Sequence, residues 1–202
     1  MLRSKAMPNI EIKVPYSDLE KARRIAREHH TEYVGVLRQT DTYFKTVAGR
    51  LKLREFGAGR PAQLIPYQKT YDAAVPMRSD YALLPVEDPA QVKRLLGALL
   101  GQEFVVDKTR EVFLIENVRV HLDQVAGLGN FVEFEAVFTD DTPDARARET
   151  ARIDRLMQLF GISAADLMRQ SYVDCLEALA RRPIQPPYND SATTSTAEIA
   201  KH

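Results

Sequence analysis

The sequence has little of several features that would define a class of protein. It contains one cysteine, Cys175, and no tryptophan, which excludes a disulfide framework and a multi-cysteine zinc site. No apolar run approaches the roughly 18 residues of a membrane-spanning helix, and residues 1–8 lack the apolar core of a secretory signal. We therefore expect a cytoplasmic protein with no membrane partner.

A surplus of charge of either sign is also missing. The 28 basic residues are balanced by 28 acidic ones, whereas a general nucleic-acid binder depends on surplus positive charge. We therefore expect no nucleic-acid partner.

The overall composition is that of a soluble globular protein. Of the 202 residues, 45% are hydrophobic and 28% are charged, and this length corresponds to about one domain. From Arg182 onward the sequence turns to Pro, Ser, Thr and Asn with few apolar residues, a composition typical of disorder. We predict one folded domain over residues 7–181 and a disordered tail over residues 182–202.

Hydrophobic periodicity predicts a mixture of strands and helices. Period-two alternation indicates strands at residues 9–14, 33–38, 40–45, 50–56, 62–70, 79–86, 108–115, 117–123 and 130–138, and helical spacing indicates helices at 17–29, 89–100, 144–160 and 171–181. Ser17 and Glu20 form a capping-box pattern at the first helix. Pro66 indicates an edge or an irregularity in its strand.

The polar faces of these strands are almost uniformly ionised. The residues on them are Glu11 and Lys13; Lys52 and Arg54; Lys108 and Arg110; Arg119, His121 and Asp123; and Glu133 and Glu135. Because the side chains of a strand alternate between its two faces, a register that buries the apolar residues must gather the ionised ones on a common face.

Two structures satisfy this pattern. One is an open sheet whose charged face is solvated, and the other is a closed barrel with the charges inside and helices outside. A charged interior is costly without a ligand of opposite sign. The candidates carry four more positive than negative charges, which suits a polyanion such as a triphosphate. The basic candidates are Lys13, Lys52, Arg54, Lys69, Arg78, Lys108, Arg110 and Arg119, and the acidic ones are Glu11, Asp123, Glu133 and Glu135.

The acidic candidates need a positive partner within an anion site. Mg²⁺ and Mn²⁺ bridge carboxylate and phosphate oxygens, and Glu133 and Glu135, two residues apart on one strand, point the same way. We therefore expect Mg²⁺ or Mn²⁺ as the cofactor.

The order of these residues resembles the CYTH superfamily, the triphosphate tunnel metalloenzymes, and is most similar to its class IV adenylate cyclases and their bacterial relatives. The resemblance covers about residues 8–180. The motifs that carry it are Asn9-Ile-Glu11-Ile-Lys13, Gln39-Thr-Asp41-Thr-Tyr43-Phe44, Gly49-Arg-Leu-Lys52-Leu-Arg54, Arg78-Ser-Asp80-Tyr81, Lys108-Thr-Arg110, Val118-Arg119-Val-His121-Leu-Asp123, Gly127-Leu-Gly129 and Phe131-Val-Glu133-Phe-Glu135.

The resemblance implies an α+β fold built on a closed eight-stranded antiparallel β-barrel, with a polar, charged lumen, helices packed outside and often a homodimer. It implies that the eight basic candidates bind the triphosphate and that Glu11, Asp123, Glu133 and Glu135 hold the metal or support its ligands. Catalysis would be carried by Lys13, Arg54, Lys108, Arg119 and Glu133. The family's first signature glutamate is Asn9 here, so an uncharged oxygen replaces a carboxylate.

The expected partner is a small-molecule triphosphate, ATP or tripolyphosphate. The expected reaction is first that of an adenylate cyclase, from ATP to cyclic AMP and pyrophosphate. The alternatives are an inorganic or thiamine triphosphatase that releases orthophosphate, and a non-catalytic nucleotide- or polyphosphate-binding module. Tyr43, Phe44 and Tyr81 either stack on a base or belong to the core, and Tyr172 either reaches the site or packs.

Overall fold

The computed structural model describes residues 9–57, 59–70, 78–138 and 142–181, and the side chains of residues 69, 70 and 78–80 are not part of this description. The predicted tail over residues 182–202 therefore lies outside the described residues, as do residues 7 and 8 of the predicted domain.

Nine strands and four α-helices occur in these ranges. The strands are β1 (Asn9–Pro15), β2 (Glu32–Phe44), β3 (Arg50–Phe56), β4 (Ala62–Thr70), β5 (Arg78–Tyr81), β6 (Leu84–Val86), β7 (Gln102–Ile115), β8 (Val118–Val125) and β9 (Gly129–Val137). The helices are α1 (Leu19–His29), α2 (Pro89–Leu100), α3 (Pro143–Phe160) and α4 (Tyr172–Ala180), with a short 3₁₀ turn, η1 (Ala164–Asp166), before α4.

The elements follow the predicted order, with three local differences. The strands predicted at 33–38 and 40–45 form one strand, β2, whereas the segment 79–86 is divided into β5 and β6. Helix α1 is capped by Asp18, whose side chain accepts a hydrogen bond from the backbone N–H of Lys21 at 2.9 Å. The predicted capping box at Ser17 is therefore wrong, because the Asp18 carboxylate occupies the N-cap.

Pro66 lies at an interruption in the sheet, as predicted, although not at an edge. Strand β4 pairs with β3 on one side and with β5 and β6 on the other. The second ladder breaks between the Tyr67–Tyr81 and Leu64–Leu84 pairs. Pro66, which has no N–H to donate, lies opposite this break.

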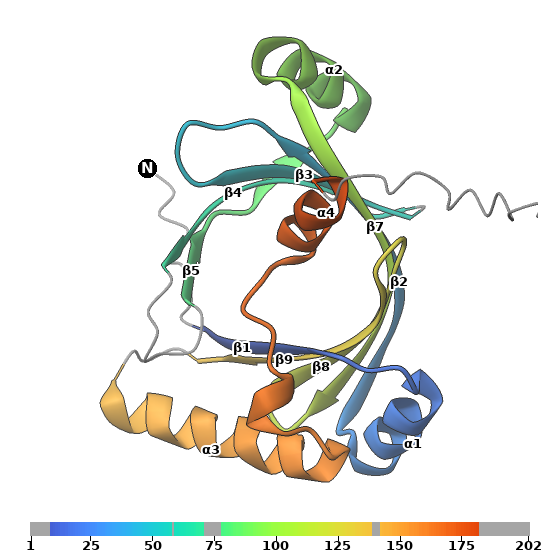
Figure 1. Ribbon diagram of the computed structural model, residues 1–202, viewed down its shortest axis with the longest axis vertical. Helices are drawn as coiled ribbons and strands as arrows, with labels where there is room; N and C mark the ends of the chain where they lie inside the picture. The colour runs from blue at the N-terminus through green and yellow to red at the C-terminus, as the bar shows by residue number, and fades with distance from the viewer. Residues whose placement is uncertain (1–8, 58, 71–77, 139–141, 182–202) are drawn as a thin grey trace, which may run out of the picture.

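The strands form one antiparallel sheet in the order β1-β9-β8-β7-β2-β3-β4-β5, with β6 attached to β4. The sheet curls until its two ends, β1 and β5, approach each other (Figure 1). No ladder joins β1 to β5 within the described ranges, so the predicted α+β class and antiparallel sheet are confirmed and the predicted closure is not. Strand β5 has only four residues and offers few backbone groups for a second ladder.

Helices cover the convex face of the curled sheet. Helices α1 and α3 pack against β1, β8 and β9, and α2 packs against β2, β3 and β7 (Figure 1). The largest apolar core lies under α1 and α3, where Phe134 contacts Phe160. Because the apolar faces of these strands point outward to the helices, their charged faces point to the concave side.

Helix α4 is the exception, because it packs on the concave side. Its residues Tyr172 and Val173 join a smaller core with Tyr43, Val106 and Phe131. Among the helices of the described ranges, none has both the length and the apolar character needed to cross a membrane.

Candidate functional site

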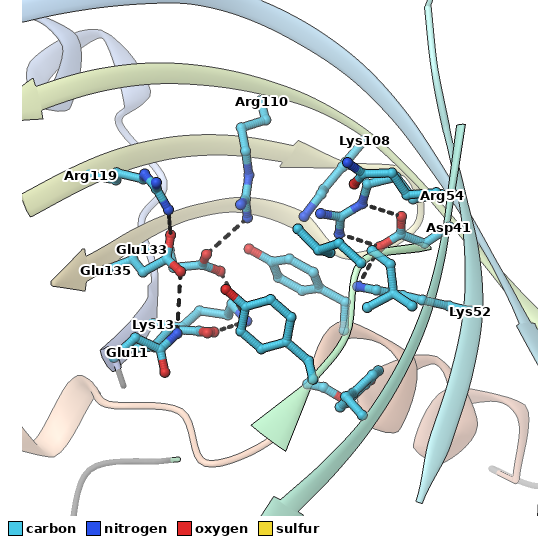
Figure 2. A pocket seen from close by; sticks show the side chains of 18 of the residues that line it. Glu11, Lys13, Asp41, Lys52, Arg54, Lys108, Arg110, Arg119, Glu133 and Glu135 are labelled. Carbon is cyan, nitrogen blue, oxygen red and sulfur yellow. Dashed lines mark hydrogen bonds and ion pairs between the residues drawn. The ribbon is translucent and has the colours of Figure 1, made fainter. Parts of the chain in front are cut away.

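The concave side of the sheet holds a pocket of about 270 Å³, lined mainly by ionised side chains (Figure 2). The basic ones are Lys13, Lys52, Arg54, Lys108, Arg110 and Arg119, and the acidic ones are Glu11, Asp41, Glu133 and Glu135. All of these except Asp41 are predicted site residues. The structure therefore brings together nine predicted residues from five strands, β1, β3, β7, β8 and β9.

The remaining three predicted residues are placed differently. The backbones of Lys69 and Arg78 lie on the paired strands β4 and β5, but their side chains are outside the described part. Asp123 is fully buried and is not among the residues that line the pocket.

The predicted surplus of four positive charges needs correction. Asp41 adds a fifth acidic side chain to the four predicted ones, and with Asp123 included the described part of the site has six basic and five acidic side chains. The predicted cations Lys69 and Arg78 lie outside this count. The described part of the pocket is therefore close to internal charge balance.

Strand register explains why these charges meet. Residues directly opposite each other in an antiparallel ladder have neighbouring side chains. The ladders place opposite charges across from one another in the pairs Lys13–Glu133, Arg119–Glu135, Arg110–Asp123 and Arg54–Asp41.

Glu133 connects three of the strands. Its carboxylate lies 3.2 Å from Lys13 Nζ, 3.1 Å from Arg110 Nη2 and 2.9 Å from His121 Nδ1. Although burial alone would raise it, the charges of Arg110 and Lys13 hold the pKa of Glu133 well below its usual range. His121 is buried and holds Glu133 from β8, which makes it an organising residue.

Asp123 fixes the orientation of Arg110. The Arg110 guanidinium donates from Nε to Oδ1 at 2.7 Å and from Nη2 to Oδ2 at 2.6 Å. The Tyr172 hydroxyl donates to Asp123 Oδ2 at 2.8 Å, and its ring lies 4.2 Å from Lys13 Nζ. Tyr172 therefore both packs and reaches the site. These donors engage both oxygens of Asp123.

Asp41 lines the pocket although it is not among the predicted site residues. Asp41 accepts from Arg54 Nε at 2.7 Å and Nη2 at 2.6 Å, and from Lys52 Nζ at 2.9 Å. The alternation gives no signal that could have found it, because Thr40 and Thr42 on either side of Asp41 are also polar. These contacts join β2 to β3 across the floor of the pocket.

Aromatic and aliphatic side chains also line the pocket. Tyr43, Tyr67 and Tyr81 line it together with Ile65 and Leu83. The candidate Phe44 instead lies in a core with Leu53 and Ala62, and it is not among the pocket-lining residues. The pocket thus combines charged side chains with surface that can contact an organic group.

Oxygen ligands suited to a hard cation gather on β1 and β9. Glu11 and Glu135 lie opposite each other, and Asn9 donates from Nδ2 to Glu135 Oε1 at 3.2 Å. The Asn9 Oδ1 atom is buried without a hydrogen-bond partner. An unsatisfied buried acceptor beside two carboxylates fits Mg²⁺ or Mn²⁺. Across the described residues, no three His, Cys, Asp or Glu side chains form a preassembled metal cluster, and the carboxylates are instead paired with basic side chains.

Comparisons with known proteins agree with this architecture. The family model described as CYTH domain matches residues 7–172, and no curated protein matches. Among solved structures, the PH1012 protein of Pyrococcus horikoshii OT3 superposes with a TM-score of 0.70 at 21% identity, over 82% of this chain and 98% of that one.

Two further solved structures have the same fold. A "putative adenylate cyclase" from Vibrio parahaemolyticus gives a TM-score of 0.70 at 21% identity, over 86% of this chain and 99% of its own. The "putative adenylyl cyclase" HpAC1 from Hippeastrum is described as having a dominant triphosphatase activity. It superposes with a TM-score of 0.61 at 14% identity, over 85% of this chain and 95% of its own. At these identities the likeness shows the fold.

Proposed function

The chain belongs to the CYTH domain family, and we propose that it is a metal-dependent enzyme on an organic triphosphate, with the reaction of a class IV adenylate cyclase. The observation that carries this proposal is the pocket, where six basic side chains lie beside carboxylates and the unsatisfied oxygen of Asn9. The cations suit a triphosphate and the oxygens suit its metal ion.

The basic side chains form two groups joined by Arg110 (Figure 2). Lys52, Arg54 and Lys108 lie at one end, and Lys13 and Arg119 lie at the other. A triphosphate spanning both groups would be held along its length. Phosphoryl chemistry depends mainly on such positioning and charge stabilisation, with little covalent work for the protein.

The metal ion would be held by Glu11, Glu135 and the Asn9 oxygen, with Glu133 beside them on β9. When bound, Mg²⁺ or Mn²⁺ neutralises phosphate charge and lowers the pKa of a coordinated hydroxyl. Asp123 would support the site by holding Arg110.

The uncharged lining residues of the pocket favour an organic substrate over tripolyphosphate. Ile65, Tyr67, Tyr81 and Leu83 offer contact area to a base or sugar, and a purely inorganic chain would leave this area unused. ATP is therefore the first candidate, and its use implies a cytoplasmic protein.

In the cyclase reaction the ribose 3′-oxygen bonds to the α-phosphorus, the bond from that phosphorus to the bridging oxygen breaks, and pyrophosphate leaves. The hydroxyl proton passes to solvent. Lys13, Arg54 and Lys108 would stabilise the charge that develops on the leaving group.

Hydrolysis to orthophosphate is the second candidate. It is favoured by the Hippeastrum protein of the same fold, which is described by a dominant triphosphatase activity. The same pocket would serve, with water attacking the terminal phosphorus in place of the ribose hydroxyl.

The test is product analysis with ATP, tripolyphosphate and thiamine triphosphate in separate incubations, each with Mg²⁺ or Mn²⁺. Cyclic AMP with pyrophosphate supports the first candidate, and orthophosphate supports the second. Arg54→Ala should lose activity chiefly through weaker substrate binding. Binding without turnover under every condition would make the protein a binding module instead.

A further inference from the structure

Asp41 is the most enclosed member of the charged cluster at the β3 end of the pocket. Its side chain is 3% exposed, whereas those of its partners Lys52 and Arg54 are 14% and 17% exposed. The two cations are therefore more accessible from the pocket than the carboxylate to which they are joined (Figure 2). Three hydrogen bonds of 2.6–2.9 Å join the carboxylate to these cations.

The Asp41 carboxylate supplies an anion to Arg54 and Lys52, as a bound phosphate would. Arg54 uses its Nε and Nη2 donors as a fork on the two oxygens of Asp41, which is the geometry in which guanidinium also binds phosphate. Lys52 adds a point charge to one of these oxygens. Asp41 thus occupies donors that the proposed substrate would also use.

The ligand-free protein needs such an anion. Burial and Arg54 lower the pKa of Lys52 to about 7, even though Asp41 raises it, and burial and Arg110 lower the pKa of Lys108 to about 8. Ammonium groups are therefore already unfavourable at this end of the pocket. Without the Asp41 charge, Lys52 and Arg54 would be buried beside Lys108 without their counter-ion, a costly arrangement.

We infer that Asp41 is an internal counter-ion that stands in for a substrate phosphate in the ligand-free protein, and that it thereby limits the affinity of the pocket for polyanions. Asp41 is a positioning residue in this scheme, because it acts through Lys52 and Arg54. The inference rests on the proposed function, since it requires that the substrate phosphates bind these two side chains.

The test compares wild type with Asp41→Asn, which keeps the shape of the side chain and removes its charge. The probe is tripolyphosphate with a chelator present, so that binding is measured by calorimetry without turnover. The ligand-free variant should unfold at a lower temperature than wild type, yet bind tripolyphosphate about tenfold more tightly, an effect of ~1.4 kcal/mol. A general structural defect would instead weaken binding. Asp41→Glu, which keeps the charge, should bind like wild type.

A matched control lies on the other face of the same sheet. Glu111 on β7 is also a buried carboxylate held by an arginine, with Arg23 Nε at 2.6 Å, but it does not line the pocket. Glu111→Gln should lower the unfolding temperature and leave the affinity for tripolyphosphate at the wild-type value.

The outcomes separate the two hypotheses. If wild type binds neither tripolyphosphate nor a non-hydrolysable ATP analogue with Mn²⁺, the proposed function fails, and this inference fails with it. If wild type binds only the analogue, the proposed function stands, and the counter-ion role is refuted unless Asp41→Asn binds tripolyphosphate. If wild type binds and Asp41→Asn binds equally or more weakly, the proposed function stands and the counter-ion role is refuted.

Asp41→Asn alone can prove too unstable to purify. The double variant Asp41→Asn/Lys52→Met removes one charge of each sign, and the inference predicts that it folds. A double variant that stays unfolded would show that Asp41 has a structural role independent of charge.

Discussion

Glu133 touches Lys13, Arg110 and His121, and this gives its substitution two separable effects. The first is on the site, where its charge orients two cations proposed to bind the substrate. The second is on the fold, because the loss of one partner from a buried ion pair leaves the other uncompensated.

Glu133→Gln should therefore lower metal-dependent turnover by at least about 100-fold and lower the free energy of unfolding by about 3 kcal/mol. Product formation and urea denaturation measure the two effects. The control is Glu20→Gln, since the Glu20 side chain is 78% exposed. If Glu133→Gln kept wild-type turnover, the proposed role of Glu133 in the site would be contradicted.

Substitutions of Asn9 test the proposed metal site, because this residue stands where the family signature has a glutamate. Asn9→Glu should bind Mn²⁺ about tenfold more tightly, because a third carboxylate joins Glu11 and Glu135. The ligand-free variant should be less stable through repulsion between like charges, and Mn²⁺ should restore its stability. Titration of free Mn²⁺ by electron paramagnetic resonance gives the affinity. Wild-type affinity in Asn9→Ala would contradict a role for the amide oxygen.

The residues that could be predicted from the sequence are those on strands with one clearly apolar face. Glu133 and Glu135 alternate with buried Val132 and Phe134, so their side of the sheet follows from the pattern. Asp41 lies between two threonines, where both faces are polar and the alternation assigns no face. Its role therefore depends on the pairing of β2 with β3, which the sequence does not show.

At the scale of elements, the site depends on how α4 is held against the sheet. Arg50 on β3 donates from Nη2 to Asp174 Oδ1 at 2.7 Å and from Nη1 to Glu177 Oε1 at 3.2 Å. These contacts fix the helix whose first residue, Tyr172, donates to Asp123.

Arg50→Ala should loosen α4 at a cost of about 1 kcal/mol, because the ion pairs are partly exposed. Amide hydrogen exchange over residues 172–180 should become faster while exchange in β8 and β9 stays unchanged. Arg155→Ala on α3, where the arginine is 60% exposed, should change neither. Unaltered exchange of α4 in Arg50→Ala would mean that apolar packing alone holds this helix.

The boundaries of β2 show why elements are harder to predict than residue faces. The ladder between β2 and β7 shifts register between Tyr33 and Gly35, and Gly35 has a φ of 114°, which favours glycine. A bulge changes which side chains face inward. The prediction of two strands has another cause, because it divides them at residue 39, where the ladder is unshifted. There the polar run from Arg38 to Thr42 interrupts the apolar alternation.

At the scale of the whole molecule, buried charge makes stability depend on pH. Nearby cations hold the pKa values of Asp41, Asp123 and Glu133 below their usual range despite burial. Their stabilisation is present above the unfolded-state pKa of about 4 and is lost as the pH falls below it. Lys52 and Lys108 affect stability at higher pH, because their pKa values are lowered to about 7 and about 8 in the folded protein.

Between these values and the unfolded lysine pKa of about 10.4, the unfolded chain holds protons that the folded protein has released, so stability rises with pH. The unfolding temperature should therefore increase from pH 7 to pH 9. Tripolyphosphate should remove this increase, because bound phosphate keeps both lysines charged. Differential scanning calorimetry measures the profile, and Lys52→Met should show a smaller rise. A profile that falls from pH 7 to pH 9 would contradict the burial of these lysines.

The curvature of the sheet determines whether its charges form one site. The sequence predicts the strands and their charged faces, but the approach of β1 to β5 depends on sheet twist and on contacts between residues far apart in the chain. The gathering of the cations in one pocket is therefore a property of the whole fold.

The most direct test of the central claim is a crystal structure of the protein with Mn²⁺ and a non-hydrolysable ATP analogue. The triphosphate should lie in the pocket on the concave side, with its oxygens within hydrogen-bonding distance of Arg54, Arg110 and Lys13. A triphosphate bound on the convex face, or a pocket that stays closed by its own ion pairs at saturating analogue, would contradict it.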